Sequence, residues 1–409
     1  MAVIRPFRAV RPDPAVASRV AAVPYDVVDT EEARALAGGN PSSFLHVSRA
    51  EIDLPAGTDP HADIVYRTAA DRYRAMKRDA PFVEDAEPTV YLYHLDADGH
   101  GQTGVAACYS LADYDRDVIK KHERTRKDKE DDRTRHVLEL NANAEPVFLT
   151  YRGRAEVDRL ADRVMQSEPL YDFTASDGVR HVVWRITDAH PWIEEFGTIQ
   201  HAYVADGHHR SASAWRAGRE LRAKAGTSHG NEEYNWFLAV LFPAEQLKIL
   251  PYNRLVRDLN GKSAAEVLDE LRALGTLAET AQPAPEAPGS IGIFLGGRWY
   301  RLTFTPESID RGDPIGSLDV SLLQDRVLTP ILGVGDPRMD ARIDFVGGIR
   351  GTAELERRVT SREMAIGFAM YPTTLEQLMA VSDAGLIMPP KSTWFEPKLR
   401  SGLFVHTLD

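Results

Sequence analysis

The chain has 409 residues, of which 43% are hydrophobic and 27% are charged, a composition typical of a soluble globular protein with about two domains. The formal net charge of −12 argues against a dedicated nucleic-acid-binding protein. The single cysteine, Cys108, excludes an intramolecular disulfide or a thiolate cluster and fits a reducing compartment. The sequence has neither the apolar core of a signal peptide at its start nor an apolar run of membrane-spanning length. We therefore expect a soluble cytoplasmic protein without membrane or nucleic-acid partners.

In chain order, the first 260 residues alternate helix and strand signals, which predicts a mixed-sheet α/β (α+β) fold. Thr30 followed by two glutamates begins a helix, and residues 61–79 form an amphipathic one. Residues 90–95 and 105–111 are β-like, and Asp98-Gly99 between them predicts a hairpin. Further strands are predicted at 146–151, 182–186, 199–205 and 236–242, with helices at 155–166 and 208–225.

The remaining residues predict a second, smaller α+β domain. Residues 278–290, rich in Ala and Pro, are the one low-complexity segment. Strands are expected at 291–295, 300–304 and 364–370, and helices at 318–332 and 375–383. We accordingly assign residues 1–260 to a catalytic region, 261–385 to an accessory domain and 386–409 to a tail that packs back onto the body.

The stretch from Asp206 to Ser211 carries the strongest functional signal. A short apolar run, an Asp-Gly turn and a helix-forming segment follow one another here. This order directs the free N–H groups and positive dipole end of a helix at one point, which suits a phosphate. Gly207 allows close approach to the backbone, and Arg210 can contact a phosphate through two N–H groups. The alternative is that Asp206 only caps a helix whose histidines lie on its surface.

Residues 118–136 form a dense run of charged side chains that has two interpretations. Lys120, Lys121, Arg124 and Arg126 could surround an anion, with Glu123 among them as a general base. Alternatively, the run is a solvated helix with ion pairs such as Glu130–Arg133 and Lys127–Asp131, which its composition alone favours.

Four other features give weaker indications of function or none. His122, His136, His208 and His209 lack the spacing of a transition-metal site. Cys108 fits a small core residue, and residues 347–351 fit a simple turn between a strand and a helix. Lys391, followed by two hydroxyl residues, is a candidate contact for a phosphate or carboxylate.

Several of these motifs together resemble a known family. Residues 205–211 (ADGHHRS), 121–125 (KHERT) and 388–393 (MPPKST) resemble the SerK-like free serine kinases, whose bacterial members are often filed only as a domain of unknown function. Segments 6–9, 23–28 and 43–47 extend the resemblance over nearly the whole chain, in order. The resemblance implies a fold similar to the ParB and sulfiredoxin group, in which such a turn binds nucleotide phosphates.

The resemblance also implies transfer of a phosphoryl group from a nucleotide to the hydroxyl of free L-serine, giving O-phosphoserine. The residues that would bind the donor phosphates are Gly207, His208, His209, Arg210 and Ser211. Glu123 is the first candidate for the base that takes the serine proton, and Asp206 is the second. His208 is also placed in the catalytic set. The donor stays open between ATP, ADP and pyrophosphate.

The remaining site assignments are Mg²⁺ on Asp206 and the serine carboxylate on Arg124 or Lys391. The long C-terminal half departs from the shorter archaeal pattern, and this leaves the acceptor open. The alternative function is a non-catalytic, ParB-like nucleotide-binding regulator, although the sequence has no helix-turn-helix followed by a basic patch. A third reading is an interaction protein with an anion site.

Overall fold

The computed structural model describes residues 2–79, 82–226 and 229–409. The chain divides into two compact units, Met1–Leu247 with Pro397–Asp409, and Lys248–Glu396. The division lies at residue 247 instead of near residue 260, because β14 (Tyr252–Val256) pairs with two strands of the second unit. None of the helices within the described ranges combines the length and hydropathy that a membrane span requires.

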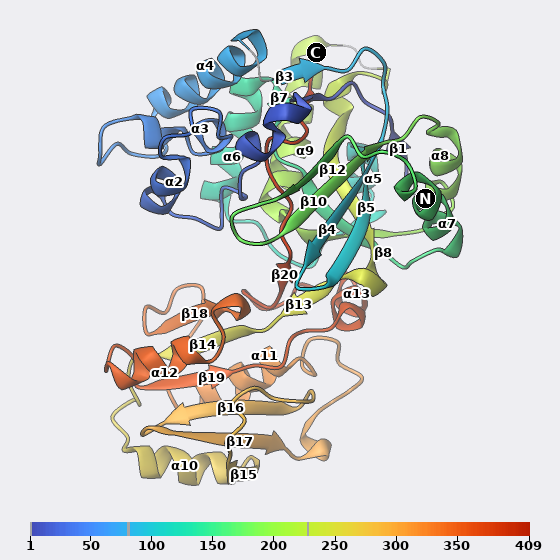
Figure 1. Cartoon of the computed structure of the whole chain (residues 1–409). Helices are drawn as coiled ribbons and strands as arrows, with labels where there is room; N and C mark the ends of the chain where they lie inside the picture. The colour runs from blue at the N-terminus through green and yellow to red at the C-terminus, as the bar shows by residue number, and fades with distance from the viewer. Residues whose placement is uncertain (1, 80–81, 227–228) are drawn as a thin grey trace. The chain divides into compact units, whose positions relative to one another are not determined.

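The first unit is built on a mixed sheet, as predicted (Figure 1). Within the described ranges this sheet has nine strands, in the order β6-β11-β8-β12-β5-β4-β10-β9, with β1 beside β5. They are β1 (Ile4–Arg5), β4 (Tyr91–Ala97), β5 (His100–Ser110), β6 (Ile119–Lys120), β8 (Val147–Tyr151), β9 (Tyr171–Thr174), β10 (Arg180–Arg185), β11 (Ala202–Asp206) and β12 (Trp236–Pro243). The β12–β8 and β11–β6 pairs are parallel, and the other pairs in this sheet are antiparallel.

The predicted strands of this unit are confirmed, including the hairpin of β4 and β5. Asp98 and Gly99 at its turn have φ values of 52° and 77°, which glycine and short polar residues tolerate best. Cys108 on β5 is fully buried and packs as a core residue, also as predicted.

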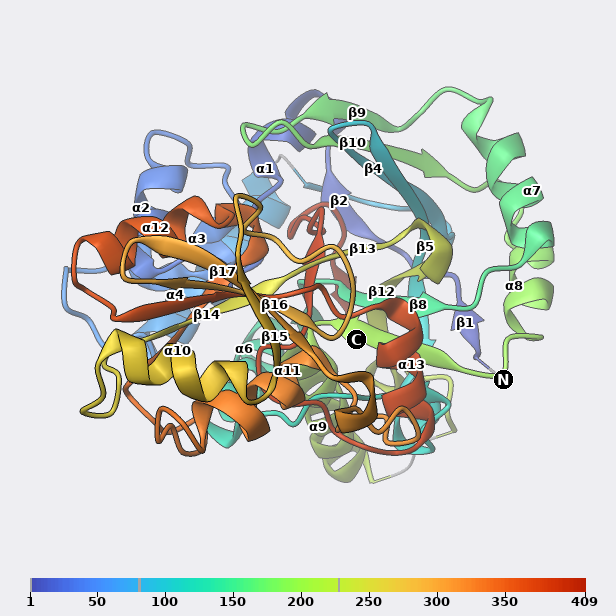
Figure 2. The ribbon, with the colours of Figure 1, turned by 90° about the horizontal axis from the view of Figure 1, so that it is seen from below.

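Helices cover this sheet and form a second layer beside it. They are α1 (Ala17–Val20), α2 (Thr30–Ala37), α3 (Leu45–Ser48), α4 (Asp63–Asp79), α5 (Leu111–Asp115), α6 (Lys127–Leu140), α7 (Ala155–Met165), α8 (His190–Phe196) and α9 (His208–Ala225). Figures 1 and 2 show α7 and α8 side by side. Their apolar faces, including Leu160 and Trp192, join the main core of the sheet.

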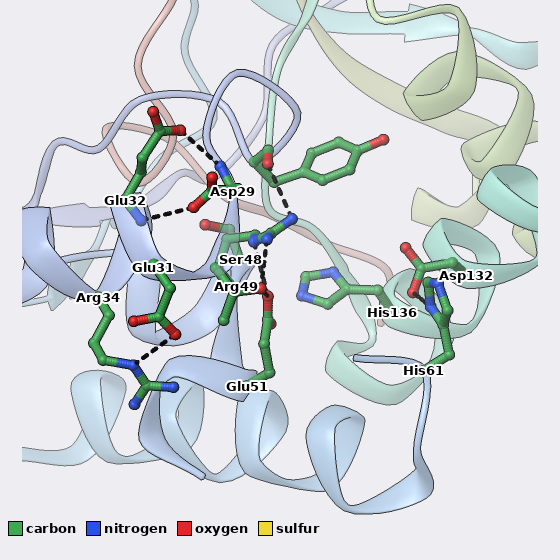
Figure 3. A network of polar contacts seen from close by, with 12 residues as sticks. Asp29, Glu31, Glu32, Arg34, Ser48, Arg49, Glu51, His61, Asp132 and His136 are labelled. Carbon is green, nitrogen blue, oxygen red and sulfur yellow. Dashed lines mark hydrogen bonds and ion pairs between the residues drawn. The ribbon is translucent and has the colours of Figure 1, made fainter. Parts of the chain in front are cut away.

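The segment α2 to α4 has its own apolar cluster, which includes Phe44 and Tyr73 and is supported by polar contacts (Figure 3). Asp29 and Glu32 form a reciprocal capping box at the start of α2, in which each carboxylate accepts from the backbone N–H of the other residue at 2.8 and 2.9 Å. Arg49 pairs with Glu51 at 2.8 Å. These contacts fix the layer against which α6 packs.

The end of the chain is divided between the units. From Pro397 onward it belongs to the first unit, where β21 (His406–Thr407) pairs with β7 (Ala142–Asn143) and Val405 bridges Val10. Val10 begins β2 (Val10–Pro12), which pairs with β3 (Phe82–Glu84). Residues 386–396 lie in the second unit, because β20 (Trp394–Glu396) pairs with β13 (Lys248–Leu250).

The second unit has an antiparallel sheet that contains six strands within its described residues, in the order β15-β17-β16-β19-β14-β18. Besides β14, these are β15 (Gly275–Glu279), β16 (Ser290–Leu295), β17 (Arg298–Phe304), β18 (Ile343–Gly347) and β19 (Ile366–Ala369). Figure 1 shows α10 (Ala264–Arg272) along the β15 edge and α12 (Ala353–Thr360) near β19, where Leu355 enters the core. The turn after β18 leads into α12, as predicted, and α13 spans Leu375–Asp383, also as predicted.

The prediction of one continuous helix over residues 318–332 is wrong. The structure has a short helix, α11 (Asp319–Leu323), followed by a π-helical turn, η6 (Gln324–Leu328). Pro330 lacks a backbone N–H and therefore stops the helix. The apolar residues that follow it lie in a turn.

Candidate functional site

The predicted strand, Asp-Gly turn and helix are confirmed at the end of β11. Gly207 has a φ of 92° and stands directly before α9, without a side-chain cap for the helix. The first helical hydrogen bond runs from the Ser211 N–H to the Gly207 carbonyl at 2.9 Å. The N–H groups of the first turn therefore have no acceptor within the helix. This geometry leaves free N–H groups at the start of the helix that can donate to an anion.

Asp206 lies between two cations. Its Oδ2 accepts from Arg210 at 2.6 Å, and its Oδ1 accepts from Lys398 Nζ at 3.2 Å. Burial opposes ionisation of this carboxyl, but Lys398 and Arg210 outweigh it and hold the pKa of Asp206 well below its usual range. The carboxylate is thus ionised at neutral pH, and 26% of its side chain stays exposed.

Arg210 points into the protein. Only 6% of its side chain is exposed, and its guanidinium donates to Asp206 and to the Pro146 carbonyl. An arginine in this position holds Asp206 and the start of β8 in place. The two-point phosphate contact expected for Arg210 would compete with these bonds, so its role toward a ligand stays a proposal.

The loop after β6 lies at the start of α9, because β6 pairs in parallel with β11. The backbone N–H of Arg126 donates to His209 Nε2 at 3.1 Å, which ties the loop to the first turn of the helix. Glu123 in this loop has 43% of its side chain exposed, and its Oε2 lies 3.9 Å from His208 Nδ1. The fold therefore brings Glu123 and the Asp206–His209 turn together.

His122 and His208 form a buried pair. Their rings meet edge to face with centroids 4.4 Å apart, and each is at most 5% exposed. Burial lowers the pKa of His208 to about 3 and that of His122 well below its usual range, so both are neutral at pH 7. Within the described ranges, His208 Nε2 is buried and has no hydrogen-bond partner. A neutral, buried His208 therefore supplies no positive charge to the turn.

Two cations of the charged run pair with neighbouring carboxylates. Lys121 pairs with Asp117 at 2.5 Å and lies over the Tyr114 ring, and Arg126 pairs with Asp128. Arg124 is exposed on the loop. Lys121 and Arg126 thus have carboxylate partners in the structure, and their role around an anion stays a prediction.

The helical alternative holds only in part. The Lys127–Asp131 pair is confirmed at 2.7 Å in α6, but the expected Glu130–Arg133 pair is wrong. Glu130 pairs with Arg216 of α9 at 3.0 Å. Arg133 points inward and pairs with Asp132 at 2.8 Å, because α6 is packed on both sides and does not lie free in solvent.

Two other predicted site residues have structural partners. Ser211 is fully buried and its hydroxyl donates to the His208 carbonyl at 3.0 Å. Lys391 belongs to the second unit, where its Nζ lies 5.4 Å from the centroid of the Tyr252 ring. Their assignment to donor phosphate and substrate stays a prediction.

Sequence reasoning missed Lys398 and Asp26 as neighbours of the turn. Lys398 is 192 residues from Asp206 and comes from the returning end of the chain. Asp26 is exposed and acts electrostatically on both His209 and Arg210. Asp26 lies in the segment 23–28 that carries the family resemblance, which was the available signal.

The residues at the turn do not form a ready metal site. Both oxygens of Asp206 already accept hydrogen bonds from cations, and no cluster of three or more His, Cys, Asp or Glu side chains suited to a metal occurs among the residues described. A Mg²⁺ ion on Asp206 would have to displace Lys398. The assignment of Mg²⁺ to Asp206 therefore stays a prediction.

A cavity lined by Arg210, Arg133, Glu145 and Ser213 has a volume of about 20 Å³, which is room for one water molecule. A phosphate cannot enter there. Asp206 and Glu123, with side chains 26% and 43% exposed, border the start of α9.

Comparison with known proteins places the chain in a family. Similar solved structures include a free serine kinase in complex with AMP, with 12% identity, a TM-score of 0.36, and coverage of 74% of this chain and 91% of that chain. Another is SbnI with a C-terminal truncation from Staphylococcus aureus, with 13% identity, a TM-score of 0.38, and coverage of 74% and 87%. Comparison with curated proteins finds no match. The model of the family DUF1015, described as a protein of unknown function, matches residues 4–321, and the chain therefore belongs to this family.

Proposed function

We propose that this protein is a small-molecule kinase that transfers a phosphoryl group from ATP, ADP or pyrophosphate to the hydroxyl of free L-serine. The motif resemblance at residues 121–125, 205–211 and 388–393 supports this proposal. The observation that carries it is the uncapped start of α9 with an ionised carboxylate and an exposed glutamate beside it. Phosphoryl transfer depends mainly on positioning and charge neutralisation, and such a corner supplies both.

The donor phosphates would bind at the first turn of α9. Its free N–H groups and the positive end of the helix dipole favour an anion, and Lys398 adds a positive charge at the same corner. A Cβ at Gly207 would lie 3.0 Å from the Arg210 guanidinium carbon, so glycine is required for the turn and leaves its backbone open. In this scheme Asp206 and Arg210 position Lys398 and the turn.

Glu123 would act as the general base. A carboxylate that is partly exposed beside the helix end can accept the proton of the serine hydroxyl. As that proton leaves, the serine oxygen forms a bond to the donor's terminal phosphorus, and the bond from this phosphorus to the bridging oxygen breaks. The leaving phosphate takes the electron pair, and the products are O-phosphoserine and the shortened donor.

The test combines product detection with one informative variant. Purified full-length protein is incubated with L-serine and with ATP, ADP or pyrophosphate in turn, with and without Mg²⁺, and O-phosphoserine is measured by mass spectrometry. Glu123→Gln should lower kcat by about a hundredfold or more while donor binding is kept. Glu220→Gln, at an exposed glutamate of α9, is the matched control and should leave kcat unchanged.

The outcomes separate the candidate functions. If no donor yields O-phosphoserine but nucleotide still binds, the ParB-like regulatory alternative replaces the kinase. If neither product nor nucleotide binding is found, the proposal of a phosphate site at α9 is wrong. If Glu123→Gln keeps full turnover, the kinase proposal survives with a different base, and Asp206 becomes the next candidate.

A further inference from the structure

The second unit contains a cavity of about 280 Å³ that is made entirely of its own residues. Strands β14 and β18, helix α11 and the π-helical turn η6 contribute to its wall. Its size is near the lower end of the range for small-molecule sites, which fits a ligand much smaller than a nucleotide. π-Helical turns are frequent at functional sites, and η6 supplies two residues of this wall.

Arg254 is a buried cation in this wall. It is 3% exposed, and its guanidinium donates to the carbonyls of Tyr252 and, at 3.0 Å, of Lys391. The guanidinium carbon lies 5.5 Å from the centroid of the Phe345 ring. Among the residues that the structure describes, no carboxylate lies within ion-pair distance of it, and burial lowers its pKa to about 10. A buried charge without a counter-ion is costly, so this position favours an anionic ligand.

Ser321 of α11 supplies a second, independent signal. It is 4% exposed and lines the same cavity, yet its Oγ has no hydrogen-bond partner among the described residues. Buried hydroxyls almost always have partners, so an unpaired Oγ on a residue of this wall favours a ligand that accepts its hydrogen bond. Arg254 and Ser321 together can therefore bind a carboxylate.

Negatively charged side chains also line the cavity. Asp325 of η6 and Asp336 line the cavity and are exposed, so they lie at its mouth. The rest of the wall combines apolar residues, Ile343 and Phe345 among them, with Gln324 and the exposed Arg338. Exposed carboxylates disfavour a multiply charged anion but attract an ammonium group.

We propose that this cavity binds a free α-amino acid, with its carboxylate on Arg254 and Ser321, its ammonium group toward Asp325 or Asp336, and its side chain against Phe345. This site consists only of second-unit residues, and the proposal does not depend on the kinase function. Binding is therefore measured without any phosphoryl donor, so failure of one proposal does not decide the other.

The experiment screens ligands against the full-length protein by thermal shift and isothermal titration calorimetry. The probes are glycine, L-serine, L-valine, L-leucine and L-glutamate, with acetate, ethylamine and inorganic phosphate as single-charge and oxyanion comparisons. At least one amino acid should raise Tm and bind more tightly than acetate or ethylamine. Overturning results are that no amino acid binds, or that phosphate binds more tightly than every amino acid.

Three variants test the assigned contacts. Ser321→Ala should weaken amino-acid binding by about tenfold while the ligand-free Tm stays the same or rises, because the alanine removes an unpaired buried hydroxyl. Arg254→Met should abolish binding, and Arg357→Met, at an arginine with 60% of its side chain exposed, should bind as the wild type does. If Arg254→Met does not fold, Ser321→Ala decides alone: undiminished binding in that variant overturns the proposal.

Discussion

Replacing Arg210 by methionine tests the buried ion pair at the candidate site. Arg210→Met keeps much of the aliphatic volume but removes the donors to Asp206 and to the Pro146 carbonyl. Breaking a buried pair by removing one partner costs about 3–5 kcal/mol. In this variant Asp206 still accepts a hydrogen bond from Lys398 and is partly exposed to solvent. We therefore expect the lower end of that range, a loss of about 3 kcal/mol in the free energy of unfolding.

The loss is measured by urea unfolding and by thermal denaturation without ligand. For a unit of this size, about 3 kcal/mol corresponds to a fall in Tm of roughly 6–12 °C. The double variant Asp206→Asn/Arg210→Met should recover part of the loss, because it removes the carboxylate left without its main partner. Lys398→Met is the matched control and should cost less, since Asp206 then keeps Arg210.

A free energy of unfolding for Arg210→Met within about 0.5 kcal/mol of the wild type, the range usual for surface positions, would refute this reasoning. It would mean that the guanidinium is not committed to Asp206 in solution. In that case Arg210 would be available to a phosphate, as the sequence alone suggested.

Three further predictions follow from the same structure. Gly207→Ala should lower the free energy of unfolding by about 1–2 kcal/mol and weaken nucleotide binding, because the φ of 92° at this position strains alanine. An unchanged urea midpoint and an unchanged nucleotide affinity would contradict this. Lys127→Ala removes the exposed i,i+4 ion pair with Asp131 and should change the free energy of unfolding by less than about 0.5 kcal/mol. A larger change, measured by urea unfolding, would show that α6 depends on this ion pair. Burial lowers the folded-state pKa of His208 to about 3 and of His136 to about 4, against about 6.5 unfolded. Below pH 6.5 the unfolded chain therefore binds more protons than the folded chain. The free energy of unfolding should fall by about 2 kcal/mol per histidine between pH 7 and pH 5. Equal urea midpoints at the two pH values would exclude neutral buried histidines.

The sequence by itself determined the local structure around the site. Helix α9 has the bounds 208–225 that its composition predicted, because Gly207 and Gly226 adopt the positive φ values that begin and end it. The strands of the first unit followed from β-prone apolar runs and turn residues, which act over a few neighbouring positions. Such signals are encoded in short segments and can be recognised without knowing the fold.

Only the tertiary structure decided which charges meet. Lys398 reaches Asp206 across 192 residues because the end of the chain returns to the first unit, and Arg133 turns inward because α6 is packed between other helices. Whether a cation faces solvent, a ligand or a buried carboxylate depends on its neighbours in space. Helical periodicity places a side chain on a face of its helix, but it does not specify what that face contacts.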